Sequence, residues 1–450
     1  MPAARSSFLG ENLNVDSAVS ATSLLSFTGD DDDKTPYERV LYGLHHDQRW
    51  LKEITLGRRV GFYRFRGELG QGNFSTVRLA LHQLTRDKVA VKVIDKAKLD
   101  QKTQRMLARE IANMDAVAHP NIIRLFEVVE TLSRIHLVLE FAPGGELFNR
   151  ITAEGRLSEN DSAKVFTQVL AAVTYLHGLS IIHRDIKAEN VFIAGPGIVK
   201  LGDFGFSTRV SSLAQQLSTF CGSPPYAAPE LYKDESYLGP AVDIWALGVL
   251  LFFVLTADMP FKANTVAGLK RHILAGSFVT PDFVSPPATD LISRLLVQDP
   301  AERPSPQIIA SHTWLSKTPE PATPLPSYVV TPKLSSEEVS SAEEETLASL
   351  EKWGINRESL EEGAPMGARS PAIATYRIML HRLLTQANTP SKVSNNNSVE
   401  TNASNTSAAS TTPTSSPCKE MVVRRPKLRL RNGLASSAPG GVKSRACNIV

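Results

Sequence analysis

Apolar and polar residues alternate along the chain from Phe62 to about Asp95, and this alternation gives the first prediction of structure. Three stretches follow one another with turn residues between them: FYRFRGELG, TVRLALHQL and DKVAVKVID. Alternation of this kind predicts consecutive strands of an antiparallel sheet, and IHLVLEF (135–141) predicts a further strand. The stretch LDQKTQRMLAREIANMDAV (99–117) has helical spacing instead, so one helix is expected between these strands.

From Gly145 to about Leu315 helical patterns dominate, among them SENDSAKVFTQVLAAVTYLHGL. The longest apolar run, ALGVLLFFVLTA (246–257), is too short to span a bilayer and predicts a buried helix. A small sheet followed by a helical block predicts an α+β architecture, with two lobes and a cleft between them.

The flanks of this region have a different composition. Residues 1–55 are rich in Ser, Ala and acidic residues, with four aspartates at 30–33, and we expect most of them to be disordered. After a Pro-rich linker, residues 334–386 recover helical patterning in LASLEKWGINRESLEE (347–362) and ATYRIMLHRLL (374–384). Residues 387–450 form a low-complexity and then basic tail that we expect to be disordered.

Composition narrows the class of protein only a little. The chain has 450 residues, of which 42% are apolar and 21% charged, as in ordinary globular proteins. A net charge of +3 is too small to indicate binding of nucleic acid. Three widely spaced cysteines form neither a disulfide framework nor a zinc pattern, which favours a reducing compartment. The first residues lack the apolar core of a signal peptide, so we expect an intracellular, cytoplasmic protein.

Two short stretches in the predicted sheet carry residues suited to phosphate. ELGQGNFSTV (68–77) places Gly70 and Gly72 in a hairpin, where backbone amides can approach phosphates without a Cβ between them. VAVK ends on Lys92, which could pair with Glu110 of the predicted helix. Taken alone, each has a simpler explanation: a structural turn and a surface lysine.

HRDIKAEN (183–190) and GDFG (202–205) are more specific. They bring Asp185, Asn190 and Asp203 into two nearby loops. Two carboxylates and an amide suit magnesium, which prefers hard oxygen ligands and keeps several waters. One carboxylate would then remain to activate a hydroxyl.

Together with Ala228-Pro229-Glu230, these motifs resemble the signature set of protein kinases, in the right order. The resemblance covers residues 61–315. It implies a bilobal fold with a small antiparallel β N-lobe containing one key helix, and a mainly helical C-lobe. It also implies transfer of the γ-phosphoryl group of ATP, with Mg²⁺, to Ser or Thr of protein substrates.

The resemblance also assigns roles to single residues. Lys92 would bind the α- and β-phosphates and pair with Glu110. Asp185 would position the acceptor hydroxyl, Lys187 would neutralise charge on the γ-phosphoryl group, and Asn190 and Asp203 would hold magnesium. The implied catalytic residues are Asp185, Lys187 and Asn190. The implied ATP-binding residues, with Leu139 as gatekeeper and 140–142 as the adenine-contacting hinge, are Leu69, Gly70, Gly72, Val77, Ala90, Lys92, Glu110, Leu139, Glu140 and Ala142.

Two further implied positions are structural. Asp243 should brace the catalytic-loop backbone, and Arg303 should pair with a buried Glu230. One departure from the family pattern is Ser75 in place of the third loop glycine, for which we expect a modest effect on nucleotide binding.

Lys187 and the stretch GSPPY resemble the serine/threonine branch of the family. Glu146 and Glu189 match acidic positions that contact basic residues upstream of the acceptor, which implies a basophilic preference, although ordinary helix-end carboxylates remain the alternative. Thr219 matches the activating phosphothreonine, which implies an upstream activating kinase and Arg184 as the partner of the phosphate. Ser223 is expected to contact Asp185 and Lys187.

TFCGSPPYAAPEL (219–231) and HPNIIRL (119–125) resemble the AMP-activated-kinase-related group near its microtubule-affinity-regulating branch, and ITLGRRVGFYRFRGELGQGNFS (54–75) most resembles the Nim-type branch. In this group a ubiquitin-associated-like domain follows the kinase domain, and residues 334–386 fit it loosely. A generic helical hairpin is the alternative, and in either case we expect contact with the kinase lobes in cis.

Other functional classes stay open at this stage. A pseudokinase scaffold is one, but Lys92, Glu110, Asp185, Asn190 and Asp203 are all present, which favours an active enzyme. The basic tail could contact anionic membranes weakly. The terminal CNIV places Cys447 where a lipid anchor would be attached, although Asn448 departs from that pattern. A solvated tail is the alternative, and no oligomer is implied.

Overall fold

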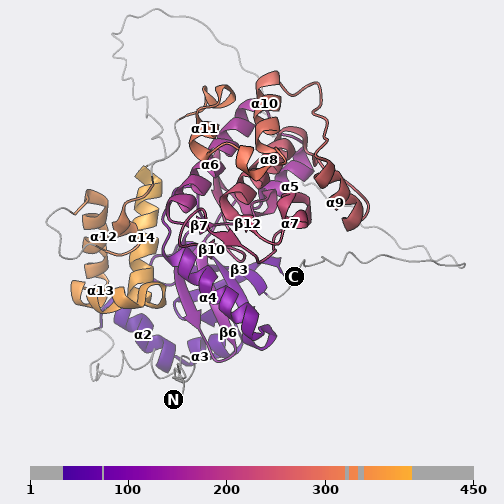
Figure 1. Cartoon of the computed structure of the whole chain (residues 1–450). Coiled ribbons are helices and arrows are strands. Elements are labelled where there is room, and N and C mark those ends of the chain that lie inside the picture. The colour runs from indigo at the N-terminus through magenta and orange to yellow at the C-terminus, as the bar shows by residue number, and fades with distance from the viewer. Residues whose placement is uncertain (1–33, 73–74, 320–323, 333–338, 388–450) are drawn as a thin grey trace, which may run out of the picture. The chain divides into compact units, whose positions relative to one another are not determined.

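The computed structural model describes residues 34–72, 75–319, 324–332 and 339–387 (Figure 1). All of them belong to one unit of the chain, and the second unit, Thr389–Asn448, lies outside the described residues. The predicted disordered tail beyond 387, its basic stretch and Cys447 therefore also lie outside them.

A six-stranded antiparallel sheet forms the N-lobe. Its strands lie in the order β1-β2-β3-β4-β6-β5. Their bounds are β1 Arg59–Val60, β2 Tyr63–Gln71, β3 Ser75–His82, β4 Lys88–Asp95, β5 Leu125–Glu130 and β6 Arg134–Glu140. The four strands predicted from alternation are confirmed as β2, β3, β4 and β6. The pattern did not predict β5, because its first four residues are all buried and do not alternate.

The helix expected over 99–117 is α4, Gln101–Asp115. It begins at 101 because the Asp100 carboxylate accepts a hydrogen bond from the Thr103 amide at 2.7 Å, which caps the helix. Its buried face carries Leu107, Ile111 and Met114, and the carboxyl of Glu110 is buried among them. α4 is thus the key helix of the N-lobe.

The C-lobe is mainly helical, as expected. Its α-helices are α5 Leu147–Glu154, α6 Glu159–Gly178, α7 Glu230–Lys233, α8 Gly239–Thr256, α9 Val266–Ala275, α10 Pro286–Leu295 and α11 Pro306–Ala310. By length and composition α8 is the one described helix that could cross a membrane, but 83% of its apolar window is buried inside the protein. It packs against α6 and α10, so the buried helix predicted at 246–257 is confirmed.

A buried ion pair joins α7 to the end of the C-lobe. The guanidinium of Arg303 donates to both carboxylate oxygens of Glu230, at 2.6 and 2.7 Å, and both side chains are almost fully buried. The expected pair is therefore present, and it anchors the segment that follows the candidate active site.

The N-terminal flank differs from its expected disorder. Residues 34–55 form two helices, α2 Pro36–His46 and α3 Gln48–Thr55, whereas residues 1–33 lie outside the described residues. Thr35 and Glu38 form a capping box, in which the Thr35 side chain accepts from the Glu38 amide and the Glu38 carboxylate accepts from the Thr35 amide at 2.8 Å. The sequence TPYE contains this capping signal, but the prediction of disorder rested on composition and did not consider it.

Three helices follow the two lobes: α12 Ser341–Lys352, α13 Arg357–Gly363 and α14 Pro371–Ala387. We call residues 339–387 the appendage. Its core includes Leu350, Ile355, Leu360 and Tyr376, and Ala118 of the N-lobe belongs to the same buried cluster. Figure 1 shows α14 between α12 and the N-lobe sheet, and α14 packs on β5. The expected contact in cis is therefore confirmed.

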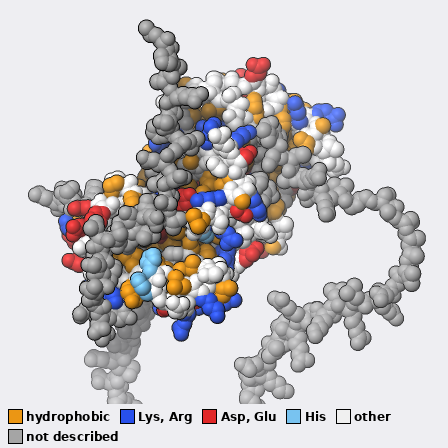
Figure 2. Space-filling view, turned by 90° about the horizontal axis from the view of Figure 1, so that it is seen from below, with side chains coloured by type: hydrophobic (Ala, Val, Ile, Leu, Met, Phe, Trp, Pro, Cys, Tyr) orange, Lys and Arg blue, Asp and Glu red, His pale blue; other side chains and the backbone are white. Residues whose placement is uncertain are grey.

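Three basic side chains of α14 reach separate parts of the N-lobe. Arg377 pairs with Asp115 at the end of α4 at 2.7 Å, and His381 contacts Glu140 at the end of β6 at 3.1 Å. Arg382 contacts Asp87 before β4 at 3.4 Å. On the face seen from below, basic, acidic and hydrophobic side chains are interspersed, consistent with a small net charge (Figure 2).

Candidate active site

Lys92 lies in β4 and holds two carboxylates from different elements. Its Nζ is 2.8 Å from Oε1 of Glu110 in α4 and 3.2 Å from Oδ1 of Asp203. Burial alone would lower the pKa of Lys92, but the two carboxylates raise it above its ordinary value. The lysine is therefore charged and fixed in place, as a phosphate-binding cation must be.

Asp203 follows β9, Ile198–Leu201, in a tight turn with a left-handed φ of 53°. The preceding Gly202 donates its amide to the Asn190 carbonyl at 2.8 Å, which joins this turn to the catalytic loop. Burial works against ionisation of Asp203, but the charge and hydrogen bond of Lys92 hold its pKa below the ordinary value. Its carboxylate is therefore ionised and available to a cation.

The loop 183–190, which we call the catalytic loop, rests on Asp243 of α8. One oxygen of this carboxylate accepts from the His183 amide at 3.0 Å and contacts Nε2 of His177 at 2.9 Å, and the other accepts from the Arg184 amide at 2.8 Å. Asp243 is fully buried, yet these hydrogen bonds outweigh burial and lower its pKa. The expected brace is present, and it supports Arg184 at a strained φ of 65°.

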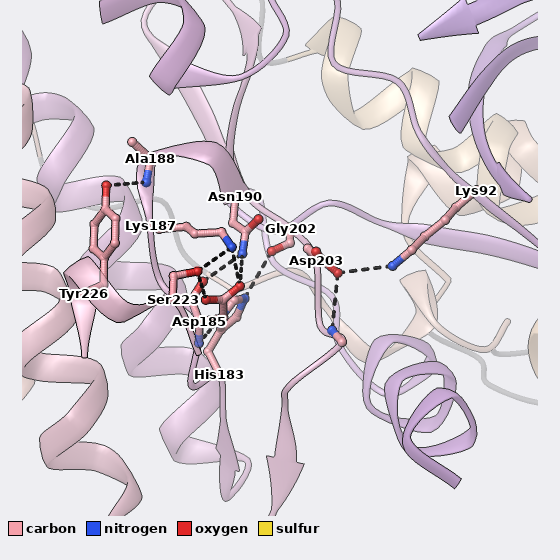
Figure 3. Close-up of polar contacts among 11 residues, drawn as sticks. Lys92, His183, Asp185, Lys187, Ala188, Asn190, Gly202, Asp203, Ser223 and Tyr226 are labelled. Atoms are coloured by element: carbon pink, nitrogen blue, oxygen red, sulfur yellow. Dashed lines mark hydrogen bonds and ion pairs between the residues drawn. The ribbon is translucent and has the colours of Figure 1, made fainter. Parts of the chain in front are cut away.

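Asp185 is the centre of the polar cluster in Figure 3. Its Oδ2 lies 2.7 Å from Nζ of Lys187 and accepts from Nδ2 of Asn190 at 3.0 Å. Its Oδ1 accepts from the Ser223 hydroxyl at 2.9 Å, and that hydroxyl in turn accepts from Lys187 at 2.8 Å. The expected contacts of Ser223 are therefore present, and both oxygens of Asp185 are oriented.

The donor set near Asp203 fits a magnesium ion. Asn190 donates through Nδ2 to the Asp185 carbonyl at 2.8 Å, which leaves its Oδ1 as an acceptor. This amide oxygen and the Asp203 carboxylate are hard ligands. Among the described residues no group of three or more His, Cys, Asp or Glu side chains could hold a metal alone. A cation here would therefore depend on phosphate and water for its remaining ligands.

The expected nucleotide-contacting residues line one face of the N-lobe sheet. Val77 pairs with Lys92, and Ala90 pairs with Leu139, across neighbouring strands. Paired residues share a face, and residues two apart on a strand do so as well. Val77, Ala90 and Leu139 are only partly buried, so this face of the sheet is partly open to solvent.

The Gly-rich hairpin lies at the edge of this face. Leu69 and Gly70 lie in β2 and are exposed, and the Gly72 amide donates to the Ser75 carbonyl at 2.8 Å. Residues 73–74 at its tip lie outside the described residues. Ser75 opens β3 and closes the hairpin through its backbone, a role for which no glycine is needed.

Glu140 and Ala142 lie where the chain passes from β6 to the C-lobe. The Glu140 side chain is buried and bound to Lys200 at 2.9 Å and to His381, so only its backbone could contact a nucleotide. Its pKa is lowered to about 2, because Lys200 and His381 outweigh the effect of burial. Ala142 is half-buried, and its carbonyl accepts from the Gly145 amide in a turn.

Two further carboxylates, those of Glu146 and Glu189, lie close enough to Lys187 to feel its charge. Glu146 lies before α5 and accepts from Nδ2 of Asn149 at 3.0 Å. Glu189 is half-buried, and its Oε2 is a buried acceptor without a hydrogen-bond partner in the described part of the chain. Burial raises the pKa of both carboxyls. An unpartnered buried carboxylate oxygen is uncommon in folded proteins.

Thr219 is exposed and lies on the segment between β11, Gln216–Leu217, and α7. Its carbonyl accepts from the Tyr237 hydroxyl at 2.7 Å and from Arg184 at 3.3 Å. Sequence reasoning did not find Tyr237, because the contact joins two segments that no local pattern connects. It also missed Tyr226, whose hydroxyl accepts from the Ala188 amide at 3.3 Å behind Asp185.

Comparison with known proteins agrees with this geometry. A family model described as the protein kinase domain matches residues 63–315. Similar proteins include "Serine/threonine-protein kinase SIK1" of Rattus norvegicus, 39% identical over 72% of this chain and 42% of the relative. "Serine/threonine-protein kinase SIK2" of Gallus gallus is 38% identical over 72% of this chain and 40% of the relative. The chain thus spans less than half the length of these relatives. With the kinase model covering more than half of its length, the chain belongs to the protein kinase family.

Proposed function

We propose that this protein is a serine/threonine kinase that transfers the γ-phosphoryl group of ATP to hydroxyl groups of protein substrates. One observation carries the proposal: the Lys92–Glu110–Asp203 cluster and the Asp185–Lys187–Asn190 cluster are both assembled in the same site. The two relatives named above are both called serine/threonine-protein kinases, which supports the choice of acceptor.

The site divides the work of phosphoryl transfer between the two clusters. Lys92 would orient the nucleotide phosphates, and Asp203 with Oδ1 of Asn190 would hold Mg²⁺, which would offset the negative charge of the phosphates. Asp185 accepts the proton of the acceptor hydroxyl as its oxygen bonds to the γ-phosphorus and the bond to the leaving ADP oxygen breaks. Lys187 stabilises the charge on the transferring group.

The test is phosphotransfer by the full-length chain, after treatment with an upstream kinase, against an arrayed library of Ser, Thr and Tyr peptides. Wild-type protein should phosphorylate Ser or Thr peptides, and Asp203→Ala should not. Glu154→Gln, on the exposed surface of α5, is the matched control and should behave as wild type. Equal product from wild type and Asp203→Ala would contradict the proposal, and ATP binding without turnover would indicate a scaffold.

We also propose a preference for substrates with a basic residue upstream of the acceptor. The support is the buried, unpartnered Oε2 of Glu189, with Glu146 close enough to influence its ionisation. An arginine of the substrate would supply the missing charged hydrogen bond. Glu189→Gln should lower kcat/KM for an arginine-containing peptide about tenfold or more and leave a peptide without arginine unchanged. Equal losses on both peptides would contradict this preference.

Activation by phosphorylation of Thr219 is the third part of the proposal. The Arg184 guanidinium already contacts the Thr219 carbonyl, and a phosphate would add about −1.5 to −2 charges beside it. An arginine–phosphate pair would then order the segment. Thr219→Ala should abolish activation by an upstream kinase but keep ATP binding, whereas Ser218→Ala, its neighbour, should still be activated. Full activation of Thr219→Ala would overturn this assignment.

A further inference from the structure

A buried polar contact joins α4 to the turn that follows Asp203. Nδ2 of Asn113 donates to the Ser207 hydroxyl at 2.9 Å, and that hydroxyl donates to the Phe204 carbonyl at 2.8 Å. Both residues are only 5% exposed. The other buried positions of α4 are apolar except for Glu110, and a buried amide is costly unless it is hydrogen-bonded. The contact is therefore specific and not incidental.

The positions of Asn113 and Ser207 show which two elements the contact joins. Asn113 lies three residues after Glu110, so both are on one face of α4. Ser207 lies four residues after Asp203, and its amide and hydroxyl both bind the Phe204 carbonyl. Glu110 and Asp203 are the two carboxylates that hold Lys92. The Asn113–Ser207 contact is thus a second link between the same two elements, independent of the lysine.

The same turn is also connected to the proposed activation site. The Arg184 side chain donates through Nε to the Phe206 carbonyl at 2.7 Å and through Nη1 to the Thr219 carbonyl. Phe206 precedes Ser207, and β10, Thr208–Arg209, follows it. Ordering of Arg184 by a phosphate on Thr219 would therefore act on a turn that Asn113 already fixes to α4.

We propose that Asn113 and Ser207 are a positioning pair that holds Asp203 and Glu110 in register around Lys92, and so sets the affinity of the site for magnesium–ATP. This inference rests on the proposed kinase function. The two residues touch neither the nucleotide nor the acceptor; they act through Asp203 and α4.

The experiment compares Asn113→Leu, Ser207→Ala and the double variant with wild type in the full-length chain. Each single variant leaves one buried polar partner behind and should lower Tm, whereas the double variant removes both and should recover much of the loss. Ser207→Thr keeps the hydroxyl and should behave as wild type. Ser212→Ala, an exposed serine of the same segment, is the matched control.

The decisive measurement is the Kd for magnesium–ATP, determined by calorimetry. It is compared with the KM for ATP and the kcat, both measured on protein phosphorylated on Thr219. In the double variant the Kd should rise about two- to tenfold even though the Tm has recovered. This is the range expected for the loss of one buried hydrogen bond. An unchanged Kd at recovered Tm would show that the pair serves packing only and overturn the inference. Because Kd does not require turnover, an inactive wild type would contradict the proposed function without affecting this measurement.

Discussion

Glu127 of β5 offers a quantitative test of how the N-lobe is packed. Its carboxyl is buried, and Oε2 accepts a hydrogen bond from the fully buried Tyr63 hydroxyl at 2.5 Å. Burial raises the pKa of Glu127 from 4.5 to about 7, although the Tyr63 hydrogen bond works against this shift. The folded chain therefore binds this proton more tightly than the unfolded chain does.

The sign of the pH dependence follows from linkage. Between the unfolded pKa of 4.5 and the folded value of about 7, the folded state binds more protons than the unfolded state. The free energy of unfolding therefore falls as pH rises through this interval and stays lower above it. At about 1.4 kcal/mol per pKa unit, ionisation of Glu127 costs on the order of 3 kcal/mol at pH 8.

Glu127→Gln removes the titration but keeps an oxygen for the Tyr63 hydroxyl. We expect its unfolding free energy, relative to wild type, to increase by about 2 to 3 kcal/mol between about pH 5 and pH 8 in urea titrations followed by circular dichroism. Tyr63→Phe, which removes the hydrogen bond that lowers the pKa, should move the falling interval of the glutamate protein to higher pH. Parallel pH profiles for wild type and Glu127→Gln would refute the reasoning.

Three further predictions concern the C-lobe, the catalytic cluster and the N-terminal helices. Glu230→Gln should lower the unfolding free energy, measured by urea titration, by about 3 kcal/mol or more, because it leaves the buried charge of Arg303 without its carboxylate. Replacing both Glu230 and Arg303 with Met or Leu should lower it much less, because no buried charge remains. Ser223→Ala should lower kcat about two- to tenfold without changing the KM for ATP, because it frees one oxygen of Asp185; steady-state kinetics with equal kcat for wild type and variant would remove this role. A chain that begins at residue 61 should melt several degrees below one that begins at 34, because burial of Val40 alone contributes about 1.5–3 kcal/mol; equal Tm values by calorimetry would show that α2 adds no stability.

The sequence predicted the strands in which one face is more buried than the other. β4 alternates, with Val89 and Val91 buried and Ala90 and Lys92 partly exposed, and that alternation is readable without a structure. β5 has no such contrast between its faces, because both α4 and the appendage pack against it. Residues 34–55 were missed although their capping box was visible, because local composition says nothing about the surface on which a helix will pack.

The residues of the site likewise fall into those that the sequence could bring together and those that it could not. Asp185, Lys187 and Asn190 lie within six residues of one another, so their association could be predicted from a motif, while their chemical roles remain predictions. Asn113 and Ser207 are 94 residues apart and Arg184 and Tyr237 are 53 apart, and each pair meets only because α4 and the C-lobe fix the segment after Asp203. Contacts of that range depend on tertiary packing, which no local pattern encodes.

The hydrogen bond from the Tyr37 amide to the Trp353 carbonyl, at 2.8 Å, ties the first described helix to the appendage. The Tyr37 ring also packs against both the sheet cluster and the appendage cluster. A ribosome makes residue 37 first and residue 353 only about 15 to 60 s later, at about 5–20 residues per second. α2 therefore has no contact with the appendage while both lobes are synthesised. The described unit is completed only when the helices of the appendage leave the ribosome. A messenger truncated within the appendage would release a chain with intact catalytic motifs but an unfinished N-terminus.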